Sequence, residues 1–211
     1  MRTNVYIDGF NLYNRAVKDT PYKWLDLLKL CKALLPNHEI QFIRYFTSLV
    51  HPLPNDLKAP IRQQVYLRAL ETIPNLSIGY GKFRDRIKIR PLVTQTGGVG
   101  QNVWVHDREE KGTDVNLATY LLMDGYDGVY EQALVISNDA DLALPISIVR
   151  DKLKRPIGVV NPNIDPNEGM PRDLRDAATF HRRLYKSVLA KCLFPDNLQD
   201  AKGTITKPSS W

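Results

Sequence analysis

Acidic side chains follow two apolar stretches of the sequence, and their types and spacing could do chemistry. A run of four apolar residues at 133–136 leads into Asp139 and Asp141. A second apolar run, at 5–7, ends directly in Asp8. Such runs are typical of buried parallel strands, and open α/β sheets place their functional groups beyond the carboxyl ends of the strands. Both acidic stretches are therefore predicted to lie at one edge of a parallel sheet.

A third acidic position stands at the start of a helical pattern, and the acids together could hold a divalent cation. Carboxylates brought close to one another repel unless a cation compensates them. Magnesium and manganese prefer oxygen ligands, and such an ion can activate a water that attacks a phosphodiester. We therefore interpret four residues as the catalytic and metal-binding cluster: Asp8, Asp114, Asp139 and Asp141. The alternative for each acid is a helix N-cap.

Asn11 completes the predicted catalytic group. It stands three residues after Asp8, in the first turn after the predicted strand. Its side-chain amide can donate and accept hydrogen bonds. We expect it to orient a water or a substrate oxygen.

The elements that must position these residues alternate along the chain. Strand patterns fall at 4–7, 39–50, 76–80, 133–137 and 156–160, and helical patterns fall at 21–35, 61–73, 113–123, 142–153 and 172–191. This alternation predicts parallel strands joined by right-handed crossovers. The expected fold class is α/β, with three α/β/α layers around a central, mostly parallel sheet.

The stretch from Lys82 to His106 breaks this alternation. Residues 95–100 have the composition of a hairpin tip, and 103–105 could return as a partner strand. Every second residue of the first strand is basic, so these side chains would share one face. We predict an inserted β-ribbon over 82–108 whose basic residues, with one more just beyond it, contact nucleic-acid phosphates: Lys82, Arg84, Arg86, Lys88, Arg90 and Lys111. The alternative is an edge strand that its charges protect from pairing.

Composition favours an ordinary globular protein. The chain has 211 residues, 43% of them hydrophobic and 25% charged, and its net charge of +6 favours polyanionic partners. No apolar run approaches the ~20 residues that a membrane span needs, and no signal-peptide pattern is present, so we expect a cytoplasmic protein without a membrane partner. Cys31 and Cys192 lack metal-ligand spacing and are expected to be buried apolar residues. The oligomeric state is left open, with a homodimer as one option.

One domain over 1–193 and a C-terminal tail over 194–211 are expected. The tail is too polar to form its own core but ends in Trp211, which we expect to anchor it marginally to the domain, with Lys207 near the nucleic-acid path. Trp24 and Trp104 are expected to be packing residues. The four histidines lack ligand spacing, so none is assigned to catalysis, and His181 is placed on a helix facing the core.

Three acidic motifs also carry a family resemblance. The stretches VYIDGFN at 5–11, EKGTDV at 110–115 and SNDADL at 137–142 resemble the NYN domain, a LabA-like branch of the PIN-like nucleases. The similarity extends to RYFT at 44–47 and RQQVYLRAL at 62–70, and covers about residues 1–190. It implies a central parallel sheet and a metal-dependent ribonuclease centre formed by the same four acids, with Asn11 beside them.

Two positions depart from that family pattern. Many LabA-like members have a further acid where Tyr120 stands, so a metal ligand is lost and the number of bound ions is open. Ala140 stands where many members have serine, which costs only a capping hydroxyl.

The sequence thus predicts an endoribonuclease that hydrolyses RNA with magnesium or manganese. One alternative is a non-catalytic RNA-binding module, although such a module has no need of four acids that repel phosphates. Another is a regulatory or scaffolding protein in which the acids are helix caps.

Overall fold

A six-stranded parallel sheet forms the centre of the molecule in the computed structural model, which describes residues 1–52, 54–93 and 97–211. Its strands are β1 (Arg2–Asp8), β2 (Glu39–Thr47), β3 (Leu76–Tyr80), β6 (Gln132–Ile136), β7 (Ile157–Asn161) and β8 (Phe180–Arg183). Every neighbouring pair in the sheet is parallel. The carboxyl ends of all six strands therefore meet at one edge.

The strand order is β3-β2-β1-β6-β7-β8. The chain first builds outward from β1 through β2 to β3, and later returns to add β6, β7 and β8 on the other side of β1. The order reverses between β1 and β6. Parallel α/β sheets form their binding crevice at such a switch point, because the connections leave the two strand ends in opposite directions.

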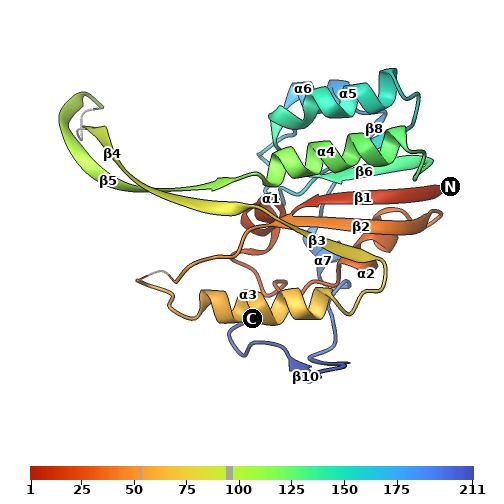
Figure 1. The fold of residues 1–211 in the computed structure, drawn as a ribbon, viewed down its shortest axis with the longest axis horizontal. Helices are drawn as coiled ribbons and strands as arrows, with labels where there is room; N and C mark the ends of the chain where they lie inside the picture. Colours follow the sequence, from red (N-terminus) through yellow and green to blue (C-terminus); the bar gives the residue numbers. More distant parts are fainter. Residues whose placement is uncertain (53, 94–96) are drawn as a thin grey trace.

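Helices cover both faces of the sheet (Figure 1). They are α1 (Gly9–Leu12), η1 (Tyr13–Val17), α2 (Leu27–Leu34), α3 (Ala59–Leu70), α4 (Thr113–Tyr126), η2 (Ala140–Leu142), α5 (Ala143–Asp151), α6 (Arg172–Ala177) and α7 (Lys186–Leu189). Alternate residues of β1 enter different cores: Val5 and Ile7 pack with α2 and α3, while Tyr6 packs with α4 and α5. The predicted three-layer α/β/α fold is confirmed.

A buried polar contact fixes the register of β1 and β2 against α4. The Tyr6 hydroxyl donates to Asp124 Oδ2 over 2.6 Å, and the Arg44 guanidinium donates to both Asp124 oxygens over 2.7 and 2.8 Å. A buried carboxylate is tolerated because it is paired and hydrogen-bonded. The ring of Tyr120 lies 4.4 Å from the Arg44 guanidinium carbon, so this tyrosine has a packing role.

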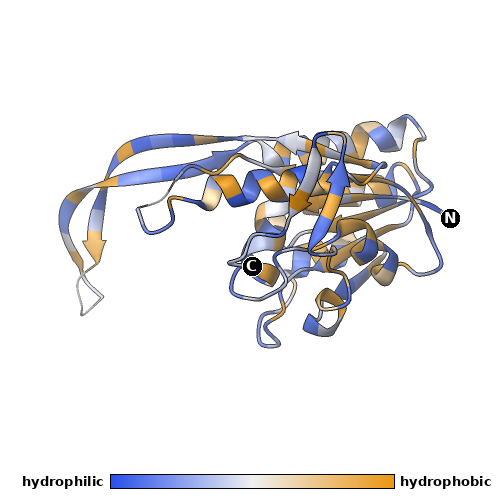
Figure 2. Ribbon diagram, turned by 90° about the horizontal axis from the view of Figure 1, so that it is seen from below, coloured by the Kyte–Doolittle hydropathy of each residue, from blue (hydrophilic) through white to orange (hydrophobic). Residues whose placement is uncertain are grey.

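The inserted ribbon is confirmed as a long antiparallel hairpin of β4 (Lys82–Val93) and β5 (Val99–Lys111). It extends to 111 rather than 108, because Lys82 pairs with Lys111. Figures 1 and 2 show it projecting away from the sheet, with hydrophobic residues scattered among hydrophilic ones. Part of the predicted tip, 95–96, lies outside the described residues.

The helix predicted over 172–191 is wrong. This segment forms α6, then β8, then α7. The strand forms because the free edge of β7 needs backbone partners, and Phe180 pairs with Gly158, where the missing side chain leaves room for its ring. Tertiary pairing has overridden a helical pattern of apolar residues. His181 is consequently exposed on an edge strand and does not face the core.

Other element boundaries also shift. The helix expected from residue 21 begins at Leu27, because Asp26 caps it by accepting from the backbone N–H groups of Leu28 and Lys29, each over 3.0 Å. The second strand ends at Thr47 rather than at 50. The strand near 156–160 was expected to be the last, but three more strands follow it.

The tail is ordered, and its predicted anchor is confirmed. Trp211 packs against Trp24 and Tyr66, with ring centroids 6.2 and 5.8 Å apart. The tail was expected to be too polar to form a core of its own, and it instead adds an apolar residue to the core of the domain. Strands β9 (Asn197–Asp200) and β10 (Gly203–Thr206) form a hairpin whose Ile205 is only 2% exposed. The tail therefore contributes its own residue to the core.

Polar contacts hold the tail as well. Arg68 of α3 donates to both Asp200 oxygens over 2.7 and 2.6 Å. The Lys207 ammonium lies 3.6 Å from Asp196 Oδ1, so it forms an ion pair within the tail.

The tryptophan and cysteine expectations have mixed outcomes. Trp24 is fully buried, as predicted, but Trp104 is 72% exposed on the ribbon and is not a packing residue. Cys31 and Cys192 are confirmed as buried free thiols. Within the described ranges, no helix has the length and apolar character required to cross a membrane.

Candidate active site at the switch point of the sheet

Asp8 and Asp139 meet where the strand order reverses, at the ends of β1 and β6. They are joined through Ser137, which is fully buried. Its hydroxyl donates to Asp8 Oδ2 over 3.0 Å and accepts from the backbone N–H of Asp139 over 3.1 Å. One hydroxyl thus links the Asp8 carboxylate, at the end of β1, to the backbone of Asp139, just beyond the end of β6.

Asn11 braces the same two turns. Its backbone N–H donates to Asp8 Oδ1 over 2.9 Å, and its side-chain oxygen accepts from the backbone N–H of Asn138 over 3.0 Å. The oxygen is therefore committed to the fold. The side-chain nitrogen has no hydrogen-bond acceptor among the described residues, so it stays available to a substrate or water.

Asp114 lies in the first turn of α4, and its pKa responds to the negative charges of the other acids. Burial and the negative charges of its neighbours raise the pKa of the Asp114 carboxyl to about 6. The neighbours are Asp8, Asp139, Glu110 and Asp141. Burial also raises the pKa of Asp8, despite the hydrogen bonds from Asn11 and Ser137. The structure brings all four predicted acids into one electrostatic environment.

Helix capping accounts for only part of this cluster. Asp8 and Asp139 do cap, since Asp8 accepts from the N–H of Asn11 and Asp139 accepts from the N–H of Asp141 over 3.0 Å. Asp114 does not, because the N-cap of α4 is Gly112 and no described residue donates to the Asp114 carboxylate. Capping leaves the placement of Asp114 unexplained.

Glu110 is a further acid that the sequence reasoning missed. It lies at the end of β5, where the ribbon returns to the domain. Ser48 donates to its Oε1 over 2.8 Å and Thr113 to its Oε2 over 2.6 Å. A Cβ on Gly81 would lie 2.3 Å from Oε1 and 2.7 Å from the backbone carbonyl oxygen of Lys111, so this close approach needs a glycine. The sequence did offer a sign of its role, because Glu110 is the first residue of the EKGTDV motif at 110–115 and stands four residues before Asp114.

The donor chemistry of the cluster suits a hard divalent cation. It consists of carboxylate oxygens, and Asn138 adds a buried side-chain oxygen with no donor among the described residues. The side chains nevertheless lie farther apart than a closed coordination shell. Within 1–52, 54–93 and 97–211, no three Asp, Glu, His or Cys side chains are close enough to hold one ion. An ion would have to draw the carboxylates inward.

The ribbon does not carry the uniform cationic face that the sequence suggested. Lys88 pairs with Asp107 and Lys111 pairs with Glu109. The first pair joins the two strands diagonally, since Asp107 is opposite Arg86 in the register, and the second lies within β5. Of the six predicted cations, four are exposed and form no ion pair with any described residue: Lys82, Arg84, Arg86 and Arg90. These four side chains leave the predicted binding face positive, but with fewer uncompensated cations than the six that were predicted.

The root of the ribbon touches the active-site helix. The ring of Phe83 packs edge-on against Phe10, with ring centroids 5.6 Å apart, and also lies 6.0 Å from His51. Since Phe10 is two residues after Asp8, the ribbon begins beside the acidic cluster.

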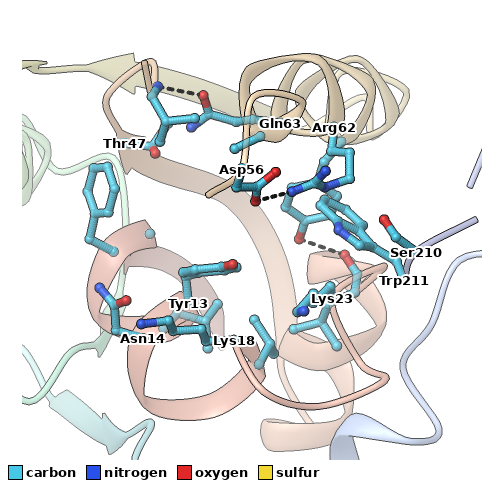
Figure 3. A pocket seen from close by; sticks show the side chains of 18 of the residues that line it. Tyr13, Asn14, Lys18, Lys23, Thr47, Asp56, Arg62, Gln63, Ser210 and Trp211 are labelled. Atoms are coloured by element: carbon cyan, nitrogen blue, oxygen red, sulfur yellow. Dashed lines mark hydrogen bonds and ion pairs between the residues drawn. The ribbon is translucent and has the colours of Figure 1, made fainter. Parts of the chain in front are cut away.

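A cavity of about 600 Å³ lies beside α1 (Figure 3). Gly9 and Phe10, directly after Asp8, form part of its wall. None of the four predicted acids lines it. The sequence reasoning gave no sign of this cavity, because its walls come from segments far apart in the chain.

The fold and site define an α/β domain with an acidic centre at the switch point of a parallel sheet. The chain belongs to the NYN domain family, whose profile matches residues 2–184. The resemblance inferred from the three acidic motifs is confirmed.

Two further comparisons qualify this assignment. The chain is 32% identical over 236 aligned positions to 6-hydroxy-3-succinoylpyridine 3-monooxygenase HspA of Pseudomonas putida (strain DSM 28022 / S16), spanning 100% of this chain and 75% of that one. It resembles the crystal structure of VPA0982, a protein of unknown function from Vibrio parahaemolyticus RIMD 2210633, with a TM-score of 0.55 and 12% identity over 88% of this chain and 93% of that one. The latter similarity concerns the fold alone.

Proposed function

We propose that the chain is a divalent-metal-dependent endoribonuclease centred on Asp8, Asp114, Asp139 and Asp141. The observation that carries this proposal is the meeting of Asp8 and Asp139 on the buried Ser137 hydroxyl, with the Asp114 carboxyl facing them. Negative charge gathered at a sheet edge is unfavourable in isolation, and a cation relieves it. NYN family membership supports the same chemistry.

The residues have separable tasks in this proposal. A bound magnesium or manganese ion would supply a Lewis acid for phosphodiester hydrolysis. The four carboxylates would hold it, and the free amide nitrogen of Asn11 would donate to a phosphate or water oxygen. Exposed ribbon cations would position the RNA backbone without taking part in the reaction.

The test is an Asp139→Asn variant assayed on mixed RNA and single-stranded DNA with manganese or with chelator. Asparagine can still accept the capping bond from Asp141, so the fold should persist while the charge is lost. We expect cleavage to fall by at least about 100-fold. The same change should weaken manganese binding measured by calorimetry.

Asp173→Asn is the matched control, because Asp173 is exposed on α6 and forms no ion pair within the described chain. It should cleave like the unmodified protein. Full activity of Asp139→Asn in manganese would overturn the assignment. RNA binding without cleavage in every metal would instead favour the non-catalytic RNA-binding alternative.

A second candidate function is monooxygenation of a substituted pyridine. The observation that favours it is the 32% identity to HspA over this whole chain. A monooxygenase inserts one atom of dioxygen into its substrate and reduces the other to water with two electrons from a donor. The test is oxygen uptake with 6-hydroxy-3-succinoylpyridine and NADH, with and without added flavin. Uptake that depends on the pyridine would support this candidate, and no uptake would exclude it under those conditions.

A further inference from the structure

The cavity beside α1 is built from three segments that are distant in the sequence. Tyr13 and Lys18 come from η1 and the turn after it, Arg62 from α3, and Trp211 from the tail. Figure 3 shows Tyr13 and Lys18 across the cavity from Arg62 and Trp211. Its volume of about 600 Å³ is in the range of sites for small organic molecules.

The charged groups of this wall leave a positive surplus. Three cationic side chains line it, Lys18, Lys23 and Arg62, against one side-chain carboxylate, that of Asp56. Arg62 and Asp56 pair with each other. Neither lysine forms an ion pair with any residue in the described ranges. The uncompensated charge therefore favours an anionic group on the ligand.

Aromatic rings form much of the remaining wall. Tyr13 is 39% exposed, and Tyr66 and Trp211 meet at the tail side with ring centroids 5.8 Å apart. Aromatic side chains bind flat rings by offset stacking or edge contacts. The combination of rings and unpaired ammonium groups selects a planar ring that bears a negative charge.

The wall is held in place by contacts within the protein. The Tyr66 hydroxyl donates to the carbonyl of Leu25 over 2.9 Å. Gln63 accepts from the N–H of Val50 over 2.8 Å and donates to the carbonyl of Ser48 over 2.9 Å. The bonds of Gln63 fix α3 against residues 48–50. A wall ordered in advance loses little conformational entropy when a ligand binds.

We propose that this cavity binds a small planar aromatic or heteroaromatic compound carrying a carboxylate or phosphate. The ring lies among Tyr13, Tyr66 and Trp211, and the anion lies near Lys18 and Lys23. A free aromatic acid and a mononucleotide share this chemistry. The site is distinct from the acidic cluster, whose residues would repel the same anion, but Gly9 and Phe10 place it directly beside that cluster.

The experiment is calorimetric titration with nicotinate and with uridine 5′-monophosphate, in chelator. Nicotinamide and uridine serve as the uncharged counterparts. We expect at least one anion to bind about tenfold more tightly than its counterpart, and Lys18→Met and Lys23→Met each to weaken it about fivefold to tenfold. Trp211→Phe should retain more affinity than Trp211→Ala, because phenylalanine keeps a ring in the wall.

Lys32→Met is the matched control, because Lys32 is exposed on α2 and does not line the cavity. It should bind like the unmodified protein. The anion that binds more tightly identifies the source of the ligand. No heat from either anion up to about 5 mM, or equal affinity in the two cavity lysine variants and the control, would overturn the proposal. Since no metal is present and no cleavage is measured, this outcome is independent of the ribonuclease proposal.

Discussion

At Asp114, burial and neighbouring negative charges act in the same direction and raise the pKa of the carboxyl to about 6 from 3.8. The folded state therefore holds this proton more tightly than the unfolded chain. Stability is unaffected below pH 4 and is lost as the pH rises from about 4 through 6, because the unfolded chain releases the proton more easily. Asp114 is only partly buried, so solvent screening reduces the cost to about 1–2 kcal/mol.

Asp114→Asn should remove that cost. In chelator we expect its free energy of unfolding to exceed that of the unmodified protein by about 1–2 kcal/mol at pH 8 and to equal it at pH 4. Urea unfolding at several pH values measures the difference. Manganese should reduce this difference in the free energy of unfolding at pH 8, because the cation stabilises the unmodified protein, whose four carboxylates are charged, more than the variant. If the variant is less stable than the unmodified protein at pH 8, the negative charge of Asp114 does not destabilise the fold and the prediction is wrong.

At the scale of elements, the ribbon separates nucleic-acid binding from chemistry. Replacing Arg84, Arg86 and Arg90 with alanine removes exposed cations that form no ion pair with any described acid. We expect RNA affinity to fall for any sequence, and the slope of log affinity against log salt to shrink by about 0.7 per lost phosphate contact. Filter binding at several salt concentrations measures both, and cleavage at saturating RNA should stay nearly constant.

Lys88→Ala provides the matched comparison on the same strand. Lys88 already pairs with Asp107, so its charge is largely compensated and its removal should change the salt slope less than any of the three arginines does. An equal change in the salt slope for all four positions would mean that RNA breaks the Lys88–Asp107 ion pair when it binds. An unchanged affinity in the triple variant at low salt would leave the ribbon as a charge-protected edge.

Local patterns were enough to predict most elements, because buried strands such as 133–136 and motifs such as VYIDGFN depend on neighbouring residues. The acidic edge followed, since parallel strands share one carboxyl end. The role of Glu110 could not be predicted, because it depends on a contact with Ser48 of a distant segment, and the Lys88–Asp107 pair could not, because it depends on cross-strand register. The break of the 172–191 helix depends on the free edge of β7, which no local window contains. The cavity depends on three distant segments.

For the whole molecule, the tail is part of the folded unit rather than an appendage. Ile205 is 2% exposed and belongs to the core on the α2 and α3 side of the sheet. Ile205→Ala should therefore lower the free energy of unfolding by about 2–4 kcal/mol through lost burial and a residual cavity. Urea unfolding followed by circular dichroism measures this. Lys202→Ala, an exposed change in the same hairpin, should have little effect, and equal effects would mean that the tail detaches freely.

The two buried thiols can be used to measure how fast the tail detaches from the domain. Burial raises the pKa of both Cys31 and Cys192, and both are free, so a thiol reagent reacts only after the surrounding structure opens. Cys192 adjoins the tail, whereas Cys31 lies inside α2. Release of the C-terminal segment should expose Cys192 before Cys31, and only global unfolding should expose both at one rate. The chain thus carries, at native positions, a pair of chemical reporters for the rate at which its C-terminal segment opens.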